Sequence, residues 1–185
     1  WVILYELFNV FVLKQTFVID DYDRLPAFSS FLPGLAGVKG IPMWTFYTNR
    51  GQGMNSFGID NKGNAIMEFN SANTAFENTT VKGFRTFLKI DGEYYEPFFK
   101  YEKEAKRQIR MNKNSFKIIE TNEKYGIEVT VNYFILPNES IGALVRQVSV
   151  KNISDSAKDI EVIDGLPKII TYGISNGEFK EMSNL

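Results

Sequence analysis

The chain has 185 residues, of which 44% are hydrophobic and 15% aromatic, and its 21 basic and 22 acidic residues leave a formal net charge of −1. It contains neither histidine nor cysteine, which excludes Ser-His-Asp and Cys-His nucleophilic sites, zinc sites built on those side chains, and disulfides. The length suits one domain, residues 1–185, and the balanced charge does not favour a nucleic-acid partner.

The first thirteen residues, WVILYELFNVFVL, are almost all apolar. This run is too short to span a bilayer and is interrupted by Glu6 and Asn9. It also lacks the basic region and the small-residue cleavage site of a signal peptide. We therefore expect one or two buried strands or a short docking segment, and no membrane partner. Because the sequence does not begin with Met, we expect a fragment or a processed chain.

Short stretches of β-branched and aromatic residues then follow one another, as in a β-rich protein. Strands are predicted at residues 16–20, 43–48, 64–69, 85–90, 127–135, 143–151 and 159–163. Asp91 and Gly92 form a two-residue turn signal, which predicts a hairpin that joins 85–90 to the segment after it. Pro, Asn, Ser and Gly separate the last three strands, which predicts an antiparallel meander.

The segment 99–111 fits two structures. Tyr101, Ala105 and Ile109 are four residues apart with charges between them, as in a helix. The lysines of the same segment also suit a charged edge strand. The fold class predicted from all these elements is all-β, a large antiparallel two-sheet sandwich with few or no helices.

The segment 40–58, GIPMWTFYTNRGQGMNSFG, carries the candidate site. Trp44 and Tyr47 have ring faces that stack on sugar rings, and Asn49, Arg50 and Gln52 supply donors for hydroxyls or for a phosphate-like anion. These five residues are the predicted substrate-binding set.

A core role is the alternative interpretation of the same segment. Alternation along a strand sends Trp44, Phe46 and Thr48 to one face and Tyr47 and Asn49 to the other. If Trp44 packs in the core, Tyr47 and Asn49 are the ligand-facing pair.

The glycines of this segment do not have the spacing of a dinucleotide-binding or phosphate-binding loop. The turn at Gly51 and Gly53 is expected to need a positive φ at one of them.

Upstream, Asp20, Asp21 and Asp23 form an acidic cluster. Paired carboxylates can act on a glycoside, but a solvated strand end, with Asp23 paired to Arg24 or capping a turn, explains the cluster as well.

The stretch FVIDDYDRLPAFSSFLPGLAGVKGIPMWTFYTNRGQGMNSFGIDNKGNAIMEF resembles the N-terminal region of 1,2-β-oligoglucan phosphorylases, which group with cellobiose phosphorylase and cyclic β-1,2-glucan synthase. FRTFLKI, ALVRQVSVKN and IDGLPKIITYGIS continue the resemblance, which covers roughly residues 16 to 175.

The resemblance implies a β-sandwich of the supersandwich, galactose-mutarotase-like type, followed by an (α/α)6 barrel that carries the general-acid aspartate and the phosphate pocket. Such enzymes cleave β-1,2-linked glucose oligomers with inorganic phosphate, with inversion, and assemble as cytoplasmic homodimers. The expected partners are therefore a β-glucan oligosaccharide, the barrel of the same polypeptide and a second copy. No catalytic residue, metal ligand or cofactor is assigned to residues 1–185. A free-standing carbohydrate-binding module and a structural interaction domain remain alternatives.

Overall fold

The computed structural model describes residues 16–99, 103–170 and 173–185, and the apolar segment 1–13 lies outside the described residues. The strands are β1 Phe17–Asp20, β2 Ser29–Ala36, β3 Ile41–Thr48, β4 Met54–Ile59, β5 Ala65–Met67, β6 Arg85–Ile90, β7 Glu93–Tyr95, β8 Ala105–Met111, β9 Ser115–Asn122, β10 Ile127–Leu136, β11 Ala143–Asn152 and β12 Ile160–Gly165. The helices are α2 Ala72–Lys82 and α3 Asn176–Ser183, and short 3-10 turns lie at Tyr22–Arg24 and Lys62–Asn64.

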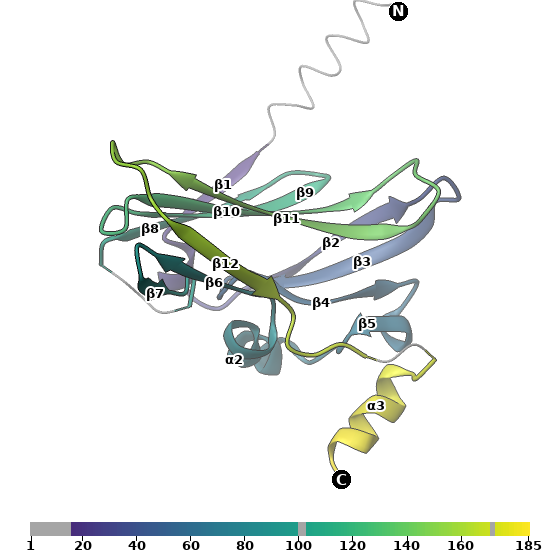
Figure 1. The fold of residues 1–185 in the computed structure, drawn as a ribbon. Helices are drawn as coiled ribbons and strands as arrows, with labels where there is room; N and C mark the ends of the chain where they lie inside the picture. Colours follow the sequence, from purple (N-terminus) through teal and green to yellow (C-terminus); the bar gives the residue numbers. More distant parts are fainter. Residues whose placement is uncertain (1–15, 100–102, 171–172) are drawn as a thin grey trace, which may run out of the picture.

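The strands form three antiparallel sheets in two layers. One layer is the five-stranded sheet β1-β8-β9-β10-β11. The sheets β12-β6-β7 and β2-β3-β4-β5 lie beneath it, with α2 and α3 on their far side (Figure 1). The prediction of an all-β antiparallel sandwich with few helices is confirmed.

The core lies between the two layers, and strand β10 shows how the sequence builds it. Alternate residues from Ile127 to Ile135 are buried, and those between them are only partly so. Tyr133 and Val131 are completely buried against the other layer. The predicted face of this strand is therefore the face that packs, as period-2 geometry requires.

The predicted hairpin at Asp91-Gly92 is also confirmed. Strand β6 pairs with β7 from Leu88↔Tyr95 to Ile90↔Glu93. Both turn residues have positive φ, 50° for Asp91 and 91° for Gly92, as a two-residue hairpin turn with the right twist requires.

The helical interpretation of 99–111 is wrong over its described part, because residues 105–111 form β8. The edge-strand alternative is wrong as well, since β8 pairs with β9 on one side and with β1 on the other. Ala105 and Ile109 are buried, and so is Arg107 between them. Residues four apart, such as Ala105 and Ile109, lie on one face in a helix and also in a strand. The residue midway between them, Arg107, lies on that face only in a strand, and Arg107 is buried with them.

The sequence-based prediction did not identify α2 or α3. In α2, Asn and Thr occupy many positions although they are weak helix formers. In α3, the Ser175 side chain accepts from the Glu178 N–H, and the Glu178 carboxylate accepts from the Ser175 N–H. The Ser175-x-x-Glu178 spacing of this capping box is a sequence signal for the start of a helix. Neither α2 nor α3 has the length and apolar character needed to cross a membrane.

Candidate functional site

Tyr47 of β3 faces the inside of the sandwich. Its ring stacks on Phe116 of β9 with 4.4 Å between the centroids, and its hydroxyl donates to the sulfur of Met111 at 3.0 Å. Only 7% of Tyr47 is exposed. The predicted ligand-facing residue therefore packs in the core, where it joins the two layers.

Trp44 lies on the opposite face of β3, as the alternation predicts. Its ring and those of Phe31, Phe46 and Phe69 form what we call the outer aromatic cluster, with centroids 4.9 to 6.4 Å apart. These separations suit favourable aromatic pairs. The Trp44 ring N–H donates to the Asn61 carbonyl at 3.2 Å. Phe46 is buried, whereas half of Phe31 is exposed, so this cluster presents an aromatic surface.

Asn49 is fully buried at the end of β3. Its Nδ2 donates to the carbonyls of Tyr22 and Pro26 at 2.9 and 3.0 Å, and its Oδ1 accepts from the Phe28 N–H at 2.9 Å. The amide is thus occupied by the chain itself, and it fixes the segment that connects β1 to β2.

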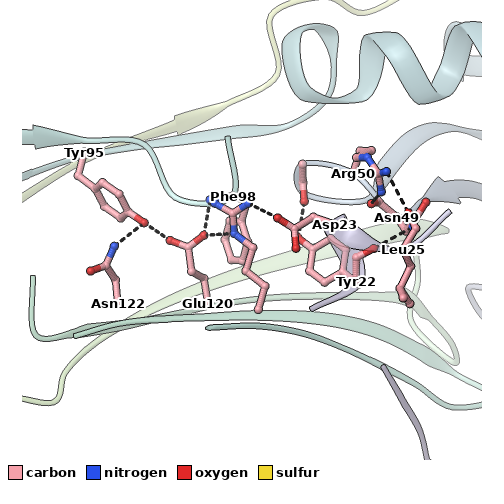
Figure 2. Close-up of polar contacts among 11 residues, drawn as sticks. Tyr22, Asp23, Leu25, Asn49, Arg50, Tyr95, Phe98, Glu120 and Asn122 are labelled. Carbon is pink, nitrogen blue, oxygen red and sulfur yellow. Dashed lines mark hydrogen bonds and ion pairs between the residues drawn. The ribbon is translucent and has the colours of Figure 1, made fainter. Parts of the chain in front are cut away.

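Arg50 follows on the same turn and is partly exposed. Its guanidinium donates to the carbonyls of Asn49 at 2.7 Å and Leu25 at 3.0 Å, and it lies 4.3 Å from the ring centre of Phe76 on α2. Desolvation lowers the pKa of Arg50, although the Asp23 carboxylate acts in the opposite direction. Figure 2 shows the hydrogen bonds of Arg50 to Asn49 and Leu25. Together with its contact to Phe76, they tie α2 to the turn that precedes β2.

Gln52 is buried and links three sheets. Its Nε2 donates to Thr86 Oγ1 of β6 at 2.9 Å, and its Oε1 accepts from Arg146 of β11. Arg146 also binds the Asp164 carboxylate of β12, which accepts from the Thr86 hydroxyl at 2.6 Å. Gln52 thus connects the 49–53 turn to both layers of the sandwich.

The turn around Gln52 needs glycine twice, which corrects the expectation of a single position. Gly51 has a φ of 51° and Gly53 a φ of 77°. A Cβ on Gly53 would lie 2.4 Å from the Phe116 ring, and one on Gly51 would lie 3.1 Å from the Thr80 Cα. Backbone geometry and close packing both explain the two glycines.

The acidic cluster separates into different environments. Asp20 accepts from the side chain of Gln108 at 2.5 Å, and Asp21 has a left-handed φ of 46° at the start of the 3-10 turn. Asp23 instead pairs with Arg107 of β8 at 2.7 Å, and its side chain is only 13% exposed. The expectation of a solvated strand end is therefore wrong for Asp23.

Arg107 belongs to what we call the buried ion network, which consists of Asp23, Arg107 and Glu120. Glu120 accepts from Arg107 Nε at 2.6 Å, from the Phe98 N–H at 2.7 Å and from the Tyr95 hydroxyl (Figure 2). Burial opposes the charge on Arg107, but the two carboxylates more than compensate and raise its pKa. Because the charged side chains of this network pair with one another, the network holds β8, β9 and the 95–98 segment together.

Two buried tyrosines have raised pKa values. Burial raises the pKa of Tyr22, whose hydroxyl donates to the Gly51 carbonyl at 2.7 Å. Burial also raises the pKa of Tyr133 to about 12, against the opposing effect of Arg146. Within the described ranges, no three His, Cys, Asp or Glu side chains are placed to hold a metal ion.

The structure therefore places the five predicted site residues in different environments. It places Tyr47, Asn49 and Gln52 inside the protein, and leaves part of Trp44 and Arg50 exposed. Sugar binding by these five residues stays a prediction.

Sequence reasoning missed Phe31 and Phe69, and the alternation of aromatic residues across two paired strands was the signal available for Phe31. Comparison with protein-family models and with curated proteins gave no match.

Proposed function

We propose that this chain is the non-catalytic sandwich domain of a glycoside phosphorylase that acts on β-1,2-glucooligosaccharides with inorganic phosphate. The resemblance of the sequence supports the proposal, and so does the antiparallel sandwich that this resemblance implies. In this proposal the sandwich supports an (α/α)6 catalytic barrel of the same polypeptide and its dimer.

The observation that carries the proposal is the role of the 40–58 segment. Most of the unusual sequence in the resemblance lies there, and the segment contacts both layers through Tyr47 and Gln52. Its buried polar groups hold a turn in one conformation, which leaves Arg50 at the surface beside α2. A rigid turn with a partly exposed cation suits the edge of a sugar or phosphate site.

A free-standing carbohydrate-binding module is the second candidate. The half-exposed Phe31 in the outer aromatic cluster favours it, because exposed ring faces can stack on sugars. A structural interaction domain is the third. Its support is the outer face of β6, β7 and β12, where Phe87, Tyr94 and Ile163 are exposed.

The test uses the longer polypeptide whose reading frame contains this sequence. Equal-length β-1,2-, β-1,3- and β-1,4-linked glucooligosaccharides are each incubated with inorganic phosphate, and glucose 1-phosphate is measured. Phosphate-dependent release from the β-1,2 series is the expected result. A reading frame that stops at residue 185, or a polypeptide inert on every β-linked glucan, would overturn the proposal.

Two substitutions in that polypeptide separate ligand contact from packing. Arg50→Ala raises KM if the turn touches sugar or phosphate, and it changes only stability or dimerisation if it does not. Tyr47→Ala is the matched comparison, because the buried Tyr47 should act through stability alone.

A further inference from the structure

A groove runs between α2 and β2 on the outer face of the four-stranded sheet. Its volume is about 270 Å³, and its lining includes Phe28, Ser29, Asn73, Phe76 and Glu77. The volume is close to the lower end of small-molecule sites, about 300 Å³.

The groove continues into the outer aromatic cluster. Ser29 and Phe31 lie on the same face of β2, since they are two residues apart, which separates them by about 7 Å along the strand. Ser29 is opposite Thr48 and Phe31 is opposite Phe46 in the β2–β3 pairing. A groove lined by both polar and apolar side chains is therefore contiguous with an aromatic surface.

Three of the four polar side chains that line the groove are not used by the described part of the chain, and the fourth, Thr48, donates to the Thr79 hydroxyl at 3.1 Å. Ser29, Asn73 and Glu77 make no side-chain hydrogen bond or ion pair with residues that the structure describes. This contrasts with Asn49 and Gln52, whose amides are bonded within the protein. The groove thus offers a hydroxyl, an amide and a carboxylate beside half-exposed Phe31.

This combination selects one class of occupant. An apolar protein segment would desolvate Glu77 and Asn73 without replacing their hydrogen bonds, which is unfavourable. A phosphate group would meet the Glu77 carboxylate as a like charge. A neutral sugar chain offers apolar C–H faces for a ring and hydroxyls that both donate and accept.

We propose that the groove and the outer aromatic cluster together bind a stretch of β-linked glucan. Phe31 packs against the C–H face of one glucose unit, and Ser29, Asn73 and Glu77 bind hydroxyls of the next unit. The identity of the sugar rests on the proposed function. The site lies beside the 49–53 turn, since Arg50 packs on the ring of Phe76, which lines the groove. It does not require catalysis by the parent protein.

The test is isothermal titration of the 185-residue chain with β-1,2-glucooligosaccharides, repeated with β-1,4-linked ones of equal length. Phe31→Ala is expected to weaken binding by about tenfold, which corresponds to one aromatic contact. Asn73→Ala, at an exposed position on α2, should weaken binding several-fold without changing the melting temperature. Tyr94→Ala, on the exposed face of another sheet, is the control and should bind like the wild type.

Absence of binding to every β-linked glucan at millimolar concentration would overturn the proposal. Binding that Phe31→Ala and Asn73→Ala leave unchanged would overturn it too, because the sugar would then lie elsewhere. These outcomes are independent of phosphorolysis. Binding in this groove without glucose 1-phosphate release by the longer polypeptide would sustain the site and reject the phosphorylase assignment.

Discussion

Glu120→Gln tests whether the buried ion network stabilises the sandwich. The glutamine has almost the same shape as the glutamate, but it replaces one acceptor oxygen by an NH₂ group. Glu120 accepts from Arg107, from the Phe98 N–H and from the Tyr95 hydroxyl. The substitution therefore turns a donor toward existing donors and removes one of the negative charges that pair with Arg107.

The magnitude follows from burial. The side chains of Arg107 and Glu120 are 5% and 1% exposed, so water cannot replace the lost interaction. Breaking a buried pair by removing one partner costs about 3 to 5 kcal/mol. That is a large part of the roughly 5 to 15 kcal/mol that stabilises an ordinary domain.

Glu123→Gln is the matched control, since the same chemical change is made three residues away. Glu123 pairs with Lys106, but their side chains are 65% and 77% exposed, and such surface pairs contribute little. Urea unfolding of both variants, followed by circular dichroism, measures the difference. A loss in Glu120→Gln that is as small as in Glu123→Gln would refute the reasoning.

Three further predictions concern other parts of the fold. Gly53→Ala should destabilise by more than about 1 kcal/mol, and by more than Gly92→Ala, because a Cβ at Gly53 meets the Phe116 ring whereas one at Gly92 has open space; equal melting temperatures would contradict this. The raised pKa of Tyr133, about 12 against an ordinary 10.0, means that the folded state keeps a proton which the unfolded state releases. Stability present below pH 10 should therefore fall by about 1.4 kcal/mol per pH unit between about pH 10 and 12, and Tyr133→Phe should reduce that slope in unfolding titrations whereas exposed Tyr94→Phe should not. Ser175→Ala removes the capping box of α3, so hydrogen exchange in α3 should speed up by roughly fivefold, for a loss of about 1 kcal/mol; unchanged exchange would mean that packing alone holds this helix.

Local patterns predicted the parts of the fold that depend on neighbours in sequence. The alternation in β10 and the Asp91-Gly92 turn are of this kind. Strand β2 was missed because Pro33 and Gly34 weaken its strand signal. The structure explains Pro33 by position, since β2 is the edge of its sheet and an edge strand tolerates proline.

The candidate site depends on contacts between distant residues, which the sequence pattern does not contain. Segment 40–58 was identified as special, but its amides could not be assigned to partners. Gln52 meets Arg146 across 94 positions, and Asp23 meets Arg107 across 84. A polar side chain on a glycine-rich turn looks the same in sequence whether it faces a ligand or a buried arginine.

We propose that this sandwich is a non-catalytic part of a phosphorylase for β-1,2-linked glucans. The most direct measurement is ³¹P NMR of inorganic phosphate mixed with a β-1,2-glucooligosaccharide, with the 185-residue chain and the longer polypeptide in separate samples. We predict a signal of α-glucose 1-phosphate only with the longer polypeptide. Formation of this product by the 185-residue chain alone, or its absence from both samples, would contradict the claim.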